Sequence, residues 1–110
     1  MRKRIRRETL EEIVYTLLQL IPMGKVSTYK SLSKIVNVHP RVIGYILRRN
    51  KDLITTPCHR VIYENGKIGG YSLGADFKKR LLKLEGVEIE EDDKISKRYI
   101  IDLAKELLEK

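Results

Sequence analysis

STYKSLSKIVNVHPRVIGYILRR, which spans residues 27 to 49, contains the signals for two short helices and a tight turn. Ser27 or Thr28 can cap the first helix, because a short side-chain oxygen there accepts from a free backbone N–H. Pro40 suits the first position of the second helix, since its missing N–H is not needed there. The inward apolar residues of the first helix are Leu32, Ile35 and Val36. The pattern predicts a helix-turn-helix.

The second helix is predicted from Pro40 to about Arg49, with a basic outer surface. Its apolar face consists of Val42, Ile43, Ile46 and Leu47. Arg41, Arg48 and Arg49 project from the remaining surface, as in a helix that binds DNA. An ordinary helical hairpin has the same periodicity, but the arginines favour the DNA-binding interpretation. His39 in the turn is interpreted as a cap or turn residue, because no second metal ligand neighbours it.

The composition indicates one basic intracellular domain. The 110 residues suffice for one hydrophobic core, and 42% of them are hydrophobic. A net charge of +8 makes nucleic acid the favoured partner and an anionic membrane surface the weaker alternative. The single cysteine excludes an internal disulfide and is typical of a reducing compartment. No apolar run approaches the roughly 18 residues of a membrane span, so we expect a cytoplasmic protein without a membrane anchor.

Basic residues crowd the N-terminus, and a helix is predicted after them. Residues 1 to 8 are expected to form a frayed basic arm, since nothing in them could pack. Thr9 and Glu12 have the spacing of a capping box, in which each side chain bonds to the other residue's backbone N–H. We therefore expect a helix that starts at Thr9 and ends near Leu20, where Pro22 stops it.

The one cysteine, Cys58, stands between Pro57 and the pair His59 and Arg60. A thiol with an ordinary pKa of about 8.5 is mostly protonated at neutral pH, so a nucleophilic cysteine needs a base or a positive field beside it. His59 and Arg60 could supply either. The alternative is a small buried thiol, the usual state of a lone intracellular cysteine, and the adjacency alone favours this alternative modestly.

A loop over residues 50 to 56 leads to the cysteine, and a β-hairpin is predicted directly after it. Residues 61 to 63 favour a strand, Asn65-Gly66 is a favoured two-residue turn, and Ile68 resumes on the other side. The following segment, residues 69 to 74, is rich in glycine but lacks the spacing of a phosphate-binding motif. We therefore expect no nucleotide cofactor.

Two further helices are predicted. The first spans residues 75 to 85 and is closed by Gly86; its apolar face consists of Phe77, Leu81 and Leu84. The acidic residues 88 to 93 are expected to form a solvated linker. An extra helix within residues 95 to 110, starting at about Ser96, has an apolar stripe formed by Tyr99, Ile100, Leu103, Ala104, Leu107 and Leu108. The predicted fold class is mainly α: a helix-turn-helix, winged-helix-like domain with a short β-hairpin next to the cysteine loop.

These segments follow the order of a known family. Pro57-Cys58-His59-Arg60-Val61, followed by Gly70-Tyr71-Ser72 and Glu85-Gly86, resembles the C-terminal domain of O6-alkylguanine-DNA alkyltransferases, the methylated-DNA--protein-cysteine S-methyltransferases. The resemblance spans residues 9 to 87, so the basic arm and the last helix lie outside it. Family members usually have an additional N-terminal domain, for which 110 residues leave no room. We expect a single catalytic and DNA-binding domain.

The resemblance implies a single-use transfer reaction without a metal or other cofactor. Family members flip the damaged guanine out of the duplex and move its O6-alkyl group irreversibly onto the cysteine. Cys58 would be the acceptor thiolate, His59 would take its proton through a water, and Glu85 would orient the imidazole. Tyr29 would donate a hydrogen bond to N3 of the guanine. The alternative for Glu85 is an ordinary surface carboxylate at a helix end.

The family also implies a set of residues that hold the flipped guanine. Ser72 would donate to O6, and the backbone carbonyls of Cys58 and Val61 would accept from the exocyclic amine. Tyr71 and Leu47 would form pocket walls. Without the family, Tyr29, Tyr71 and Leu47 would all be interpreted as core residues, and this alternative stays open for Leu47.

DNA contacts are implied along the second helix of the helix-turn-helix. Arg41 would enter the duplex from the minor groove and fill the gap left by the flipped base, and Gly44 would let the helix approach the DNA backbone. Arg48 and Arg49 would contact phosphates or form a solvated surface. Asn50 would tie the helix-turn-helix to the cysteine loop through side-chain-to-backbone hydrogen bonds. The expected partner is double-stranded DNA containing O6-alkylguanine, bound by a monomer.

Leu73 and the missing N-terminal domain leave a second function open. Leu73 stands where members commonly have glycine and could narrow the pocket, and Lys51 replaces a common proline. The alternative function is that of an alkyltransferase-like protein, which binds alkylguanine without efficient transfer. In such proteins another residue, commonly tryptophan, replaces the cysteine, so Cys58 argues against this alternative. A third hypothesis, a helix-turn-helix transcription factor with a buried cysteine, predicts preference for an undamaged sequence.

Overall fold

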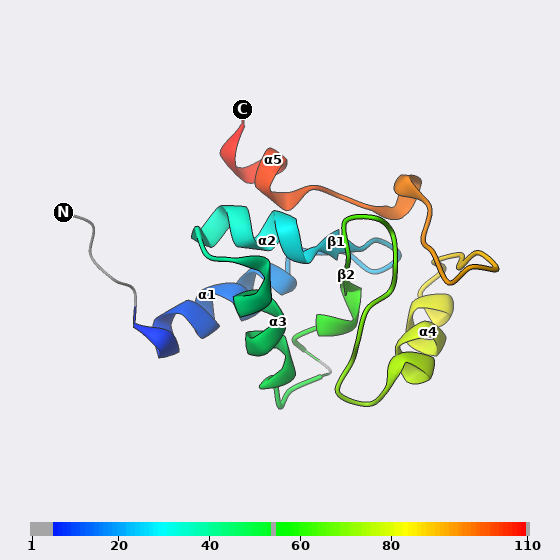
Figure 1. Ribbon diagram of the computed structural model, residues 1–110, viewed down its shortest axis with the longest axis horizontal. Coiled ribbons are helices and arrows are strands. Elements are labelled where there is room, and N and C mark those ends of the chain that lie inside the picture. The colour runs from blue at the N-terminus through cyan, green and yellow to red at the C-terminus, as the bar shows by residue number, and fades with distance from the viewer. Residues whose placement is uncertain (1–5, 54, 110) are drawn as a thin grey trace.

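The computed structural model describes residues 6–53 and 55–109 and has a mainly helical fold (Figure 1). Its helices are α1 (Arg7–Leu18), α2 (Tyr29–Val36), α3 (Pro40–Arg48), α4 (Ala75–Leu84) and α5 (Leu103–Leu108). Its strands are β1 (Ser27–Thr28) and β2 (Val61–Ile62), and two short 3-10 turns are η1 (Cys58–Arg60) and η2 (Lys97–Tyr99). The helices α1, α2 and α3 lie on one side of β1 and β2, and α4 lies on the other (Figure 1).

The predicted helix-turn-helix is confirmed as α2 and α3. The Thr28 hydroxyl caps α2 by accepting from the backbone N–H of Ser31, at 3.0 Å. Pro40 is the first residue of α3, and His39 caps that helix by accepting at Nδ1 from the N–H of Arg41, at 3.0 Å. Both helix starts therefore have the local chemistry that the sequence predicts.

The first helix starts earlier than predicted. α1 begins at Arg7, its N-cap is Arg6, and no side chain caps it, so the capping box at Thr9 is wrong. The carbonyl of Arg6 accepts from the N–H of Leu10, and the Arg7 guanidinium lies 5.0 Å from the centre of the Tyr45 ring. Arg7 therefore belongs to the helix and not to the predicted basic arm, of which residues 1–5 lie outside the described residues.

The core has two parts, one on each side of β1. In the larger part, α1, α2 and α3 enclose the fully buried residues Val14, Leu18, Ile21, Leu32 and Ile43. In the smaller part, β1, β2 and α4 enclose Val26, Ile62, Leu82 and Val87. The prediction that Val42 faces inward is wrong, because the buried stripe of α3 is narrow and consists of Ile43, Ile46 and Leu47.

The strand after the cysteine does not form the predicted hairpin ladder. β2 pairs in parallel with β1, with Ser27 opposite Val61 and Thr28 opposite Ile62. The tight turn does form, since the N–H of Gly66 donates to the carbonyl of Tyr63 at 3.0 Å. One bond of the predicted hairpin forms, from the N–H of Tyr63 to the carbonyl of Lys67 at 2.9 Å. The returning segment otherwise pairs with the residues before η2: Lys67 bridges Lys94, and the carbonyl of Gly66 accepts from the N–H of Ile95. The neighbours of β2 come from distant parts of the chain, which a local turn signal cannot reveal.

Helix α4 turns a different face inward from the predicted one. Lys78 and Leu82 are fully buried, whereas Phe77 and Leu84 are 47% and 84% exposed. The ammonium of Lys78 is bonded to three backbone carbonyls, which fixes the rotation of the helix. The predicted C-terminal cap is confirmed: Gly86 has a φ of +94°, in the left-handed region that glycine adopts without strain.

The C-terminal helix is shorter than predicted. α5 begins at Leu103, capped by Asp102, because the residues before it are extended along β1. Val26 donates to the carbonyl of Tyr99 at 2.9 Å and accepts from the N–H of Ile101 at 2.8 Å. α5 then packs on α2 (Figure 1), and its predicted inward residues Leu107 and Leu108 are exposed.

The acidic segment between α4 and η2 is solvated, as predicted, but it forms a turn whose two sides pair through their backbones, and not a linker. Ile89 and Ile95 bridge its two sides in antiparallel fashion, and Ile95 is buried. The acidic residues 90 to 93 between them are exposed. Within residues 6–53 and 55–109, no helix has the length and apolar character needed to cross a bilayer.

Candidate active site

A cavity of about 730 Å³ lies where α2, α3, η1 and the loop before α4 meet. Many of the predicted site residues line it together: Tyr29, Arg41, Gly44, Leu47, Arg48, Cys58, Tyr71 and Ser72. Pro40, Tyr63 and Gly70 complete the lining. The structure thus brings residues from four separate segments of the chain to one hollow beside the second helix of the helix-turn-helix.

The Cys58 thiol is both buried and part of the cavity wall. Its residue is 4% exposed and begins the turn η1. Burial raises the pKa of the thiol above its ordinary value, while a hydrogen bond with Asn50 and the positive charge of Lys78 counteract this effect. The thiol at rest is therefore protonated at neutral pH and requires a base before it can attack.

Asn50 connects the end of α3 to the segment before the cysteine. Its side-chain amide donates from Nδ2 to the carbonyl of Thr56 at 2.9 Å, and its Oδ1 accepts from the N–H of Asp52 at 3.0 Å. Asn50 is 8% exposed and lies outside the cavity lining. These are the side-chain-to-backbone bonds that the family resemblance implies for this residue.

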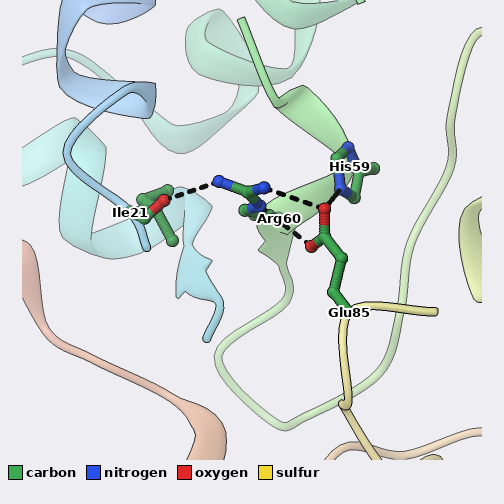
Figure 2. Close-up of polar contacts among 4 residues, drawn as sticks. All are labelled: Ile21, His59, Arg60 and Glu85. Carbon is green, nitrogen blue, oxygen red and sulfur yellow. Dashed lines mark hydrogen bonds and ion pairs between the residues drawn. The ribbon is translucent and has the colours of Figure 1, made fainter. Parts of the chain in front are cut away.

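His59 is held by the carboxylate of Glu85, as Figure 2 shows. The distance from Nε2 of His59 to Oε2 of Glu85 is 2.9 Å. Because a carboxylate can only accept, Nε2 carries the proton, and Nδ1 is left with a free lone pair. Nδ1 is buried and has no hydrogen-bond partner among the described residues. Burial lowers the pKa of His59 and outweighs the opposing effect of Glu85, so the imidazole is neutral and can accept a proton at Nδ1.

The side chain of Arg60 pairs with the carboxylate of Glu85 and not with the thiol of Cys58. Its Nε donates to Oε1 of Glu85 at 2.9 Å, and Nη2 donates to Oε2 at 2.8 Å (Figure 2). Nη1 donates to the carbonyl of Ile21 at 2.8 Å. Burial acts to raise the pKa of Glu85, but the hydrogen bonds from Arg60 and His59 outweigh it and hold that pKa below its ordinary value. Glu85 is therefore ionised, and Arg60 does not supply the positive field that its position beside Cys58 and His59 suggests.

Lys78 is the functional candidate that the sequence analysis missed. Its buried ammonium donates to the carbonyls of Val61 and Ile68, both at 2.7 Å, and of Gly70 at 3.1 Å. Burial lowers its pKa to about 7, and the negative charge of a Cys58 thiolate acts in the opposite direction. No signal in one sequence distinguishes Lys78 from its neighbour Lys79, because only the rotation of α4 separates the buried lysine from the accessible one.

Five predicted site residues lie outside the cavity lining: Arg49, Asn50, His59, Val61 and Glu85. Val61 is fully buried, and its carbonyl accepts from Lys78, which leaves one lone pair for a further donor. Arg49 bonds through Nε to Glu11 at 3.0 Å. Leu73 is 54% exposed and is not among the lining residues, so the structure gives no support to a pocket narrowed at this position.

Tyr63 is a lining residue that the sequence analysis assigned only to a strand. Its ring is tilted against that of Tyr29, with 5.3 Å between the centroids. Burial, together with the neighbouring Tyr63 and Cys58, raises the pKa of Tyr29 to about 12. The Tyr29 hydroxyl is therefore protonated at neutral pH and able to donate a hydrogen bond.

The fold and the cavity define a helix-turn-helix domain with a cysteine in the hollow beside its second helix. The chain belongs to the family described as "6-O-methylguanine DNA methyltransferase, DNA binding domain", whose model matches residues 9–87. A relative from Saccharolobus islandicus, named methylated-DNA--protein-cysteine methyltransferase, is 50% identical over 78 residues. That match covers 71% of this chain and 51% of the relative, so the chain spans about half the length of the curated relatives it matches.

Two solved structures resemble the fold to different extents. The O6-methylguanine-DNA methyltransferase of Pyrococcus kodakaraensis is 45% identical, with a TM-score of 0.65, over 70% of this chain and 46% of that one. Atl1 of S. pombe, crystallised in complex with damaged DNA containing O6-carboxymethylguanine, is 29% identical with a TM-score of 0.78. The Atl1 match covers 88% of this chain and 98% of that one, which is more of this chain than residues 9–87.

Proposed function

We propose that this protein repairs O6-alkylguanine in double-stranded DNA by accepting the alkyl group on Cys58. The observation that supports the proposal is a buried thiol in a cavity wall, next in sequence to a neutral imidazole that an ionised carboxylate orients. A nucleophile, a base and a group that orients the base form the usual arrangement for activating a weak nucleophile. The transferred alkyl group would remain on Cys58 as a stable thioether, so each molecule would react once.

The proposed chemistry is a displacement at the alkyl carbon. Nδ1 of His59 takes the thiol proton through a water, and the sulfur of Cys58 forms a bond to the alkyl carbon as the bond from that carbon to O6 breaks. The electron pair of the broken bond passes to the guanine, where Tyr29 donates to N3 and Ser72 to O6. Glu85, fixed by Arg60, stabilises the imidazolium that forms. The imidazolium then releases the thiol proton through water to N1 of the guanine anion, so the products are an S-alkylcysteine, an unmodified guanine and a neutral His59.

The proposed substrate position is the cavity, because the target atom cannot be reached inside the base stack. A volume of about 730 Å³ lies in the range of ligand pockets and exceeds what a purine requires. Tyr71 and Leu47 form apolar walls, and each carbonyl of Cys58 and Val61 has a lone pair left for the exocyclic amine of guanine.

The proposed DNA contacts lie on α3. Arg41 lines the cavity at the first turn of the helix and would replace the flipped base in the stack. Gly44 offers no side chain, so the helix can approach the DNA backbone closely, and Arg48 and Arg49 would contact phosphates. The proposed binding unit is a monomer of this domain on duplex DNA.

A methyl-transfer assay tests the proposal. The protein is incubated with a duplex that contains one O6-methylguanine, digested and analysed by mass spectrometry. One added methyl group on the Cys58 peptide is expected, and a Cys58→Ala variant should bind the same duplex without acquiring the group. An unmodified Cys58 under conditions where the wild type binds the duplex would refute transfer.

A second candidate function is recognition of alkylguanine without efficient transfer. The nearly complete overlap with Atl1, in both chains, favours it. The same assay separates the two functions, because a sensor would bind the lesion duplex more tightly than an undamaged duplex and leave Cys58 unmodified. Equal affinity for damaged and undamaged duplexes would argue against both functions and favour a sequence-specific helix-turn-helix protein.

A further inference from the structure

The N-terminus of α1 carries a basic cluster that adjoins the exposed side of α3. The guanidinium carbons of Arg7 and Arg49 lie 5.0 and 5.7 Å from the centre of the Tyr45 ring. Tyr45 is 41% exposed, and both arginines are exposed as well. An arginine that stacks on an aromatic ring still has N–H groups at its edge, which suit the oxygens of a phosphate.

The cluster is continuous with the mouth of the cavity. Tyr45 stands one helical turn after Arg41 and one turn before Arg48, and both of these arginines line the cavity. One turn is a rise of about 5 Å, so the Tyr45 cluster lies within one or two phosphate spacings of them. A helix that lies in a DNA groove has a sugar-phosphate strand on each flank, and α1 begins on one flank of α3 (Figure 1).

The charge of the cluster also suits an anion. Glu11 accepts from Nε of Arg49 at 3.0 Å and neutralises one of the two guanidiniums. The side chain of Arg49 is nevertheless half exposed, whereas that of Glu11 is 17% exposed, so the remaining N–H groups of Arg49 can bind a phosphate while its Nε stays paired with Glu11. The side chain of Arg7 lies over the Tyr45 ring, and a ring does not neutralise its charge.

We propose that Arg7, Tyr45 and Arg49 form a phosphate-contact site that extends the DNA interface from α3 onto the start of α1. The proposal rests on the proposed function, because it requires duplex DNA as the partner. The ligand is the sugar-phosphate backbone of DNA, so the contact is independent of base sequence and of the lesion. Tyr45 holds the two guanidiniums at one place, which reduces the rotamer entropy lost when they bind.

The salt dependence of binding to undamaged duplex tests the site. Each phosphate contact contributes about 0.9 to the slope of log affinity against log salt concentration. Arg7→Gln and Arg49→Gln should each reduce the slope by about 0.9 and weaken binding. Arg7→Lys should keep most of the slope, because the charge is preserved. The matched control is Arg80→Gln, which changes an exposed residue of α4, a helix far from α1 (Figure 1). This variant should change neither the slope nor the affinity for duplex DNA.

Single-turnover transfer to a methylated duplex separates this site from the lesion pocket. In Arg7→Gln the duplex concentration for half-maximal rate should rise several-fold, whereas the rate at saturation should equal that of the wild type. Wild-type slopes in both glutamine variants would overturn the phosphate site while leaving the proposed function intact. Failure of the wild type to bind duplex or to accept a methyl group would instead overturn the proposed function and this inference with it.

Discussion

The ammonium of Lys78 lies 2.7 Å from the carbonyl oxygen of Val61 and donates a hydrogen bond to it from a fully buried position. The same ammonium reaches the carbonyls of Ile68 and Gly70. One side chain of α4 therefore joins β2 to the loop that carries Tyr71 and Ser72 into the cavity. The charge is also near enough to Cys58 to favour its thiolate.

Lys78→Met should destabilise the fold and reduce the reactivity of the thiol. Three buried carbonyls lose their donor, so we expect the free energy of unfolding to fall by about 2–3 kcal/mol, with part of the loss offset by removal of a buried charge. Because the nearby positive charge is lost, the pKa of Cys58 should rise and its reaction with iodoacetamide should slow.

Lys79→Met is the matched control for this change. Lys79 is the next residue of α4, but it forms accessible ion pairs with Asp76 and Asp93. Its loss should cost less than about 1 kcal/mol and leave the thiol reaction unchanged. Equal effects of the two variants, measured by urea unfolding and by iodoacetamide kinetics, would show that the buried ammonium has no special role.

The helix-turn-helix could be predicted from sequence because its signals are local. The hydroxyl of Thr28 and the ring of Pro40 act within one turn of their own positions, and the structure has both helix starts there. The capping box at Thr9 has an equally good local pattern, but the helix extends past it to Arg7. A tertiary contact of Arg7 with Tyr45 accompanies this extension, and no local pattern contains it.

The site was predictable only in part. Of the residues that the family resemblance assigns to the pocket, Tyr29, Leu47, Tyr71 and Ser72 line one cavity with Cys58 in its wall, whereas Val61 lies outside the lining. The inward position of Lys78 and the parallel pairing of β2 with β1 were not predicted, because both depend on partners far away in the sequence. The pairing of Arg60 with Glu85 was not predicted for a related reason: Glu85 is 25 residues further along the chain.

The pH dependence of alkyl transfer should report the neutral state of His59. Burial lowers the pKa of His59 below 6.5, and the proposed base must be unprotonated. Protonation of Lys78 near pH 7 should not lower the rate, because its positive charge favours the thiolate. We therefore expect the acid limb of the single-turnover rate to be centred below pH 6.5. An acid limb centred at or above 6.5 would exclude a buried neutral His59 as the base.

The free energy of unfolding should also change as His59 titrates, and it should fall as the pH is lowered. The unfolded chain binds a proton at the ordinary histidine pKa, whereas folded His59 binds it only at lower pH, so the unfolded state holds more protons between these two values. Acidification through this window should therefore destabilise the wild type, and His59→Gln should remove this component. His39→Asn, which keeps a side-chain acceptor at the start of α3, is the control. Its alkyl-transfer rate should depend on pH in the same way as that of the wild type.

Glu85→Gln tests whether Glu85 stabilises the fold and orients the imidazole of His59 for transfer. The variant cannot pair with the charge of Arg60, whose side chain is 14% exposed, so we expect a loss of about 2 kcal/mol in stability. A poorly oriented imidazole should slow transfer by about 100-fold. Glu88→Gln, which removes an exposed partner of Arg98, should change stability by less than about 1 kcal/mol and leave the rate unaltered.

The stability difference between the wild type and Glu85→Gln should depend on pH, because the pKa of Glu85 is lowered in the folded protein. The stabilisation provided by ionised Glu85 is complete above the pKa of about 4.5 that this group has in the unfolded chain. It is lost as the pH falls through the lower pKa of Glu85 in the folded protein. The wild type and Glu85→Gln should therefore converge in stability at low pH. A difference between them that persists in full at about pH 2 would show that the ionised carboxylate is not its source.

Ser31→Ala should reveal how the C-terminal segment supports the helix-turn-helix. The Ser31 hydroxyl donates to Oδ1 of Asp102 at 2.7 Å and accepts from the N–H of Ala104 at 2.9 Å, which fastens α5 to the first turn of α2. Loss of both bonds should lower the free energy of unfolding by about 1–2 kcal/mol. Because the Ser31 bond is the main cause of the lowered pKa of Asp102, that pKa should rise in the variant, as measured by NMR titration.

Ser33→Ala is the matched control, because Ser33 is as deeply buried on the same helix but bonds only to the carbonyl of Lys30 in its own turn. Its loss should cost about 0.5 kcal/mol and leave Asp102 unchanged. Tyr29 lies in the same first turn of α2 as Ser31, so a loosened attachment should also slow alkyl transfer in Ser31→Ala and not in Ser33→Ala. Equal stability losses together with equal transfer rates would show that α5 covers α2 without positioning the cavity.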